Sequence, residues 1–103
     1  MDRKIIDTIR KIKPKFAFDG FIILGVFGSY AREEETPRSD IDILYEVNPD
    51  FVNKYRGFQA YRRLDEIRNE LSGIFHRDID ITDKDALGEI GRKYILSEVK
   101  YVG

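Results

Sequence analysis

The sequence predicts a small α/β domain in which a mixed sheet of three to four strands carries helices on one face. Apolar residues recur at helical spacing in three segments, which are residues 5–12, 58–71 and 87–99. Between them lie apolar or alternating segments typical of strands, which are residues 21–27, 40–47 and 74–81. Helical and strand segments that alternate along one short chain are typical of α/β architecture.

The length of the chain predicts one domain, residues 1–103, because 103 residues leave no room for a second hydrophobic core. A hydrophobic content of 42% predicts that the chain folds. The chain has no cysteine, and its longest apolar run, residues 21–27, is shorter than a membrane span of roughly 20 residues. We therefore expect a cytoplasmic protein without membrane segments. The net charge of -1 argues against direct nucleic-acid binding.

The first half of the chain predicts a helix that Pro14 ends, followed by a strand at residues 21–27 that is buried on both faces. A Gly28-Ser29 turn comes next, and residues 30–35 are expected to form a short polar helix. In the following strand, residues 40–47, a period of two places Asp40 and Asp42 together on one face.

In the second half, residues 48–50 break the chain and the longest helix extends from Phe58 toward Gly73, a glycine typical of a helix C-terminus. The strand predicted at residues 74–81 carries Asp78 and Asp80 on one face, and an amphipathic helix closes the chain.

The residues that carry chemistry are a Gly-Ser turn and three aspartates. Gly28 lets a phosphate approach the backbone and Ser29 adds a hydroxyl donor, although such a turn alone is common. Asp40 and Asp42 repel each other unless a divalent cation, Mg²⁺ or Mn²⁺, neutralises them, and Asp80 can join them if its strand is adjacent. The alternative is that these are solvent-facing acids on a one-sided sheet.

A calcium-binding helix-loop-helix is a competing interpretation of the second acidic segment. Asp78, Asp80, Thr82 and Glu89 match its positions 1, 3, 5 and 12, but Asp83 stands where that loop needs glycine. The sequence also has no Walker-type phosphate loop, and a single histidine cannot supply a histidine-rich metal site.

Gly28-Ser29-x-Ala31-Arg32 followed by Ser39-Asp40-x-Asp42 resembles the minimal nucleotidyltransferases of the DNA polymerase beta superfamily, and the match covers nearly the whole chain. Members of this group are similar to antitoxins encoded beside HEPN-domain toxins. The resemblance implies that the chain is an antitoxin that transfers AMP from ATP to a tyrosine of its HEPN toxin partner.

The resemblance also implies roles for single residues. Catalysis and metal binding are assigned to Asp40, Asp42 and Asp80, and phosphate binding to Gly28, Ser29, Arg32 and Ser39. The chain departs from the family pattern at Glu33, where the family often has glycine. The alternative function is an antitoxin that neutralises its partner by binding alone.

Overall fold

The computed structural model describes residues 3–28, 36 and 39–102 of the chain. Its helices are α1 (Arg3–Ala17), α2 (Pro49–Lys54), α3 (Phe58–Phe75), the 3-10 turn η1 (Lys84–Ala86) and α4 (Glu89–Glu98). Its strands are β1 (Phe21–Phe27), β2 (Ile41–Val47), β3 (Ile79–Asp83) and β4 (Lys100–Tyr101). None of the described helices combines the length and the apolar character that a membrane crossing requires.

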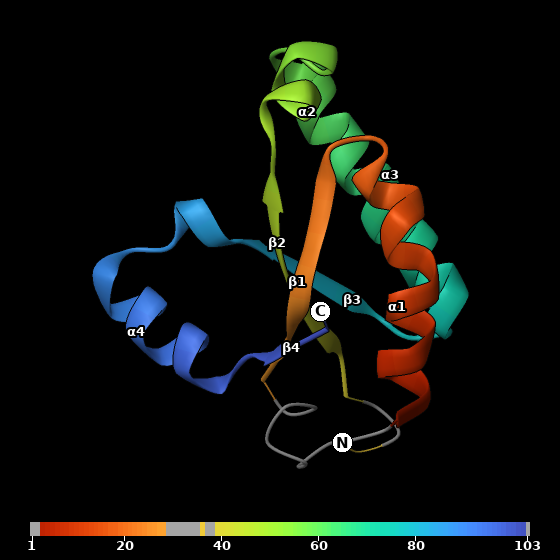
Figure 1. Ribbon diagram of the computed structural model, residues 1–103, viewed down its shortest axis with the longest axis vertical. Coiled ribbons are helices and arrows are strands. Elements are labelled where there is room, and N and C mark those ends of the chain that lie inside the picture. Colours follow the sequence, from red (N-terminus) through yellow and green to blue (C-terminus); the bar gives the residue numbers. More distant parts are fainter. Residues whose placement is uncertain (1–2, 29–35, 37–38, 103) are drawn as a thin grey trace.

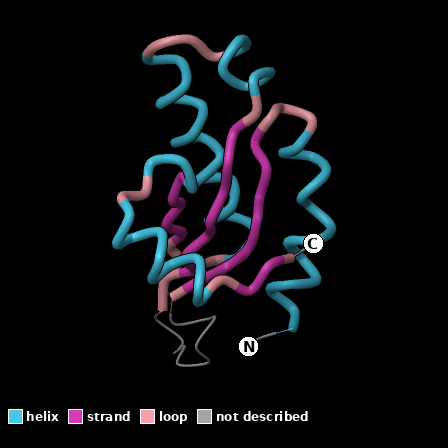
Figure 2. The backbone as a smooth tube through the Cα atoms, turned by 60° about the vertical axis from the view of Figure 1, so that its left-hand side comes forward, coloured by secondary structure: helices cyan, strands magenta, loops and turns pink. Residues whose placement is uncertain are grey.

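The strands form one mixed sheet in the order β3-β2-β1-β4, which confirms the predicted fold class. β1 pairs antiparallel with both β2 and β4, whereas β2 and β3 are parallel. The long strands β1 and β2 lie side by side in the centre, and β4 is a short strand at one edge (Figure 2). The parallel pair is possible because α2 and α3 carry the chain back between the ends of β2 and β3.

One face of the sheet is covered by α1 and α3. Alternate residues of β2, such as Ile41 and Ile43, are fully buried on this face together with Ile9 of α1 and Leu71 of α3. Burial of these side chains is the main stabilising term of the fold, at about 1.5–3 kcal/mol for each large apolar side chain. We call this surface the core face.

The opposite face carries the aspartates and also α4, so the prediction that the helices lie on one face of the sheet is wrong for α4. The connection through η1 and α4 leads from β3 at one edge of the sheet to β4 at the other edge. Because α1 and α3 occupy the core face, this connection passes the opposite face, and Figure 1 shows α4 on the side away from α1 and α3. We call this second surface the acidic face.

Three predicted boundaries are wrong, which are the end of the first helix, the end of the longest helix and the start of the third strand. α1 continues through Pro14 to Ala17, because Phe16 is fully buried and its packing outweighs the hydrogen bond that proline removes. α3 continues past Gly73 to Phe75, which packs against the core, and His76 ends the helix in the left-handed conformation with φ 54°. The third strand consequently begins at Ile79 and not at residue 74.

Three elements, α2, η1 and β4, were not predicted from the sequence. α2 begins at Pro49 after the strand break, and the Asn48 side chain caps it by accepting a 3.2 Å hydrogen bond from the Phe51 amide. β4 has only two residues, which is too short for a pattern. The helix expected at residues 30–35 lies outside the described residues.

Candidate functional site

Two of the three predicted aspartates are direct neighbours in the sheet. Asp42 of β2 stands opposite Asp80 of β3 in the parallel ladder, so both side chains lie on the acidic face. Neighbouring strands are about 4.8 Å apart, which brings carboxylates on adjacent strands close together. The side chain of Asp42 is half-buried and that of Asp80 is exposed.

The third aspartate precedes β2 by one residue. Asp40 is exposed, and its spacing of two from Asp42 gives it the same side of the extended chain. The amide of the intervening Ile41 donates a 3.0 Å hydrogen bond to the carbonyl of Asp78. The parallel pairing of β2 and β3 therefore continues to this end of the sheet and holds the Asp40 segment beside the start of β3.

Gly28 lies directly against Asp42. Its predecessor Phe27 pairs with Asp42 across the β1–β2 ladder, and Gly28 itself has φ 73°, a left-handed conformation that favours glycine. A Cβ atom added at Gly28 would overlap Oδ2 of Asp42. The structure thus brings one predicted phosphate-binding residue to the carboxylates, with bare backbone facing them.

Ser39 organises the turn that leads into the site. Its hydroxyl accepts a 2.8 Å hydrogen bond from the Thr36 amide, and its own amide donates a 3.0 Å hydrogen bond to the Thr36 carbonyl. These bonds fix the backbone immediately before Asp40. The other predicted phosphate-binding residues, Ser29 and Arg32, lie outside the described residues, as does Glu33.

A polar cavity of about 300 Å³ opens beside the aspartates at the edge of the sheet. It is lined by residues of the two parallel strands and of α3, which are Asp40, Arg68, Asn69, Ser72, Asp78, Ile79 and Asp80. The α3 residues were missed by sequence analysis, because polar residues on the outer side of an amphipathic helix carry no signal of a site.

The charges around this cavity are unevenly matched. Arg68 is engaged by Asp65, at 2.6 Å between the guanidinium and carboxylate. The ion pairs between described residues involve Asp19, Asp65, Glu66 and Glu70 as their acids, and none of them involves Asp40 or Asp80. Among the described residues, no ion pair therefore balances the carboxylates of Asp40 and Asp80, which favours a cation or the positive side of a ligand there.

The donor set suits a hard divalent cation, because carboxylate oxygens are the ligands that Mg²⁺ and Mn²⁺ prefer. Within the described part of the chain, no three acidic or histidine side chains are already gathered closely enough to hold an ion. The aspartates are thus neighbours through the strand register without being drawn to one point, as expected for like charges that repel each other.

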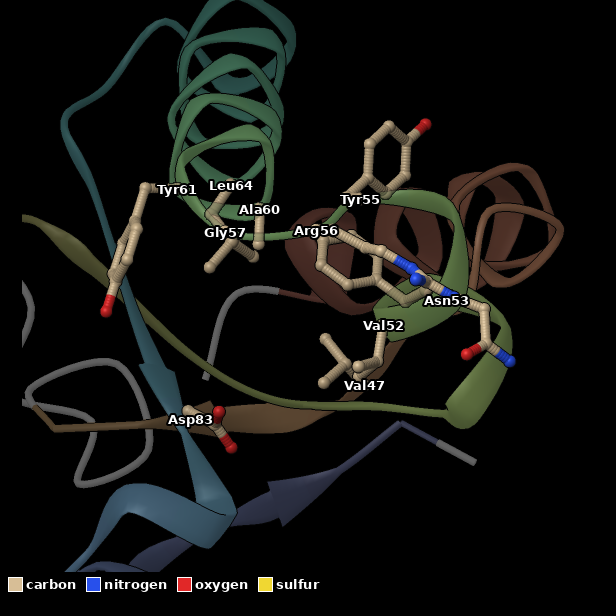
Figure 3. Close-up of a pocket in the computed structure, with 11 residues that line it drawn as sticks. Val47, Val52, Asn53, Tyr55, Arg56, Gly57, Ala60, Tyr61, Leu64 and Asp83 are labelled. Carbon is tan, nitrogen blue, oxygen red and sulfur yellow. The ribbon is translucent and has the colours of Figure 1, made fainter.

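A larger cavity of about 620 Å³ lies at the other end of the sheet, on the core face (Figure 3). Its walls are mainly apolar and come from the end of β2, from α2 and from the start of α3, with Tyr61 and Leu64 on one side (Figure 3). Asp83 reaches it, because odd-numbered residues of β3 point toward the core face. This cavity is therefore separate from the aspartates at the start of β2.

Comparison with known proteins gives consistent matches over almost the full chain. The family model of the nucleotidyltransferase domain matches residues 4–101. Two proteins of Methanocaldococcus jannaschii, each named "putative protein adenylyltransferase", are similar to this chain. The first is 36% identical, and the match covers 96% of this chain and 95% of the relative. The second is 32% identical, and the match covers 94% of this chain and 89% of the relative.

Two solved structures share the fold. One, of a "putative minimal nucleotidyltransferase", aligns with a TM-score of 0.69 and 27% identity over 97% of this chain and 95% of that one. The other, of a "toxin-antitoxin with AMP-PNP", aligns with a TM-score of 0.65 and 21% identity over 97% of this chain and 70% of that one. At 21% identity the second likeness concerns the fold alone.

Proposed function

The chain belongs to the nucleotidyltransferase domain family, and from this premise we propose that it transfers AMP from ATP to a tyrosine hydroxyl of a cognate HEPN-domain toxin, as the antitoxin of that pair. The observation that carries the proposal is the pairing of Asp42 with Asp80 across the parallel ladder, with the bare backbone of Gly28 against Asp42. Carboxylates beside a glycine turn offer both halves of a nucleotide site, a metal-binding half and a phosphate-binding half.

The reaction is an in-line displacement at the α-phosphorus of ATP. The acceptor oxygen forms a bond to this phosphorus, the bond to the β-phosphate oxygen breaks, and pyrophosphate leaves. The proton of the acceptor hydroxyl passes to the carboxylate of Asp80 and from there to solvent. Since the protein forms no covalent intermediate, catalysis rests on positioning and on neutralisation of charge.

Each residue of the site has a role in this scheme. Asp40 and Asp42 hold the ion that accompanies the triphosphate, and Asp80 serves the acceptor side. Gly28 permits close approach of the phosphates, together with Ser29 and Arg32. Ser39 keeps the turn before Asp40 in place through its bond with Thr36. When bound, Mg²⁺ or Mn²⁺ neutralises phosphate charge and stabilises the leaving pyrophosphate.

The acceptor comes from another protein in this proposal. The cavity next to Asp80 measures about 300 Å³ and has a polar lining, so it fits a single side chain better than a second nucleotide-sized substrate. The relatives named as protein adenylyltransferases support a protein as the acceptor, and the fold shared with a toxin-antitoxin structure supports a toxin as its source.

Intact-mass spectrometry of the purified pair tests the proposal. The partner to be tested is a HEPN-domain protein, sought in the reading frame beside that of this chain and called the HEPN-domain neighbour below. It is incubated with the chain, ATP and MgCl₂. We expect the partner to gain the mass of AMP units only when both ATP and Mg²⁺ are present. Asp80→Asn should abolish the gain and leave ATP binding to the chain intact, because Asp80 serves the acceptor side.

Asp50→Asn is a matched control, because it makes the same exchange at an exposed carboxylate but in the first turn of α2, at the other end of β2. This variant should transfer AMP as the parent does. A stable and inhibited complex that never gains mass, at any concentration of nucleotide or metal, would show instead that the chain neutralises its partner by binding alone.

A further inference from the structure

α4 is a helix whose residues are at most half-buried, and Ile95 and Leu96 are among the half-buried ones. It has ten residues, and none of them is buried, although the sequence gives it apolar residues at helical spacing. Ile90 and Tyr94 are 76% and 67% exposed and lie one helical turn apart, so they form one outward apolar strip. An isolated helix of this length is marginal in water, which makes an apolar strip on it costly unless something covers it.

This strip lies on the same side of the sheet as the proposed site. The chain leaves α4 and enters β4 at Lys100, which pairs with Val26 of β1, next to Phe27. Phe27 pairs with Asp42. In addition, Tyr101 pairs with Gly25, so the Tyr101 side chain, which is 59% exposed, belongs to the acidic face.

We infer that the α4 strip, defined as Ile90 and Tyr94, is the docking surface for the protein that brings the acceptor hydroxyl. This inference rests on the proposed function. Asp80 lies on the acidic face and also lines the edge cavity proposed for the acceptor, and α4 is the helix that flanks this face in the described part of the chain (Figure 1). The chemistry that fits is an apolar patch with basic residues beside it, which meet the carboxylates at the start of β2 and β3.

The charge of this face argues against a second copy of the chain as the occupant. A two-fold pairing through the acidic face would bring the carboxylates of both copies toward each other, and like charges across an interface cost energy. The α4 strip alone is also far smaller than the roughly 800 Å² that each partner contributes to a stable interface. A partner that covers α4 together with the acidic face reaches this area. Its charge matches when basic residues meet the carboxylates at the start of β2 and β3 and acidic residues meet the exposed Arg92 and Lys93 of α4.

Chemical labelling can test the docking surface cleanly, because the chain has no cysteine. We compare Tyr94→Cys in the α4 strip with Phe58→Cys at the start of α3, where the native side chain is 90% exposed. A maleimide should modify both cysteines equally fast in the free chain. With the HEPN-domain neighbour bound, we expect labelling at position 94 to slow at least about tenfold and labelling at position 58 to stay unchanged.

A second pair of variants measures affinity. Ile90→Glu with Tyr94→Glu should weaken the complex by at least about a hundredfold, because two apolar anchors are replaced by carboxylates that must be desolvated against the apolar patch of the partner. Val52→Glu with Phe58→Glu is the control, since these side chains are also exposed but lie at the other end of the fold. Both variants should bind ATP with Mg²⁺ as the parent does.

Several outcomes would overturn the inference. If position 94 is labelled equally fast with and without the HEPN-domain neighbour, the α4 strip is not the docking surface, whether or not a complex forms. Slowed labelling of position 94 in the free chain at high concentration, with a dimer in solution, assigns the strip to a second copy. If AMP is transferred but position 94 is not protected, the proposed function stands and the docking surface is rejected. If position 94 is protected but no AMP is transferred, the docking surface stands and the proposed function is rejected.

Discussion

Aspartates occur at both ends of the β1–β2 hairpin, and the two ends use them differently. Asp19, before β1, is buried and bonded to three partners, Lys54 Nζ at 2.8 Å, Tyr55 Oη at 2.7 Å and Arg63 Nε at 2.7 Å. At the other end, Asp40 and Asp80 have no ion pair with a described residue. A carboxylate whose charge is balanced within the chain supports the fold, and one whose charge is not balanced is available to a ligand.

The pKa of Asp19 reflects its partners. Burial alone would raise this pKa, but hydrogen bonds from Lys54, Tyr55 and Arg63, together with the positive charge of Arg63, outweigh burial and lower it to about 2. The network joins the end of α1 to α2 and α3, so it holds the helices of the core face together at the end of the sheet remote from the proposed site.

The largest effect should come from Asp19→Asn. The substitution removes the charge that balances Arg63, whose side chain is only 19% exposed, and disruption of a buried pair costs about 3 kcal/mol. Denaturant unfolding measures the free energy of unfolding. ATP binding under native conditions should not change. A loss below about 1 kcal/mol would mean that Glu66 and Glu70, which also contact Arg63, replace Asp19.

Asp40→Asn should give the opposite result. We expect it to weaken binding of Mg²⁺-ATP by at least about a hundredfold, because a charged metal ligand is lost. The free energy of unfolding should stay equal or rise slightly, since one of several neighbouring like charges is removed. Calorimetric titration and denaturant unfolding of the same samples check both statements. A variant that is strongly destabilised would place Asp40 with Asp19 among the structural carboxylates.

The next largest effect should come from acid, which should weaken the Asp19 end of the hairpin. The folded pKa of Asp19 is about 2 and the ordinary value is 3.8, so its stabilisation is fully present above about pH 4 and is lost as the pH falls toward 2. The loss amounts to about 2 kcal/mol at 1.36 kcal/mol for each pH unit. Unfolding measured from pH 5 to pH 2 should show this slope in the parent and not in Asp19→Asn.

The sequence predicts the acidic site better than the Asp19 network, and the reason is physical. Asp40 and Asp42 belong to one strand whose period of two fixes their common face, and a parallel neighbour then brings Asp80 to Asp42. Asp19 and Arg63 are 44 residues apart, and their contact depends on how α3 packs, which no local pattern encodes. The same limit applies to Arg68 and Asn69 at the cavity, whose place follows from the packing of α3 beside β3.

The helix ends show a related limit. Pro14 and Gly73 are local signals for helix termination, and both are overruled by a following side chain that packs in or against the core, the fully buried Phe16 or the half-buried Phe75. The closing helix shows the reverse for two residues, because its apolar spacing predicts burial of Ile90 and Tyr94, which stay exposed, whereas Val99 is buried. Apolar periodicity therefore predicts a buried face without telling which chain buries it.

Gly28→Ala should have a smaller effect. This variant tests whether the backbone at Gly28 belongs to the acidic site. The left-handed φ of 73° costs about 1 kcal/mol for alanine, and the new methyl group overlaps Oδ2 of Asp42. Gly57→Ala is a matched control, because Gly57 has φ 59° but no atom within 4 Å of an added Cβ. Both variants should lose stability, because alanine is strained at a positive φ, and only Gly28→Ala should weaken the binding of Mg²⁺-ATP. Equal ATP binding by the two variants would mean that Gly28 is a turn residue only.

The smallest effect is expected for Asp65→Ala, because burial and not distance determines how much an ion pair contributes to the free energy of unfolding. The Asp65–Arg68 contact measures 2.6 Å and the Asp19–Arg63 contact 2.7 Å, but the side chains of the first pair are 61% and 47% exposed and those of the second 10% and 19%. Solvent screens an exposed pair, so Asp65→Ala should cost at most about 0.5 kcal/mol, and salt should diminish even that. Denaturant unfolding in low and high salt measures it beside Asp19→Asn. A loss at Asp65 as large as the loss at Asp19 would mean that Arg68 has a structural role at the edge cavity, and the contrast between the two ends of the hairpin would then no longer hold.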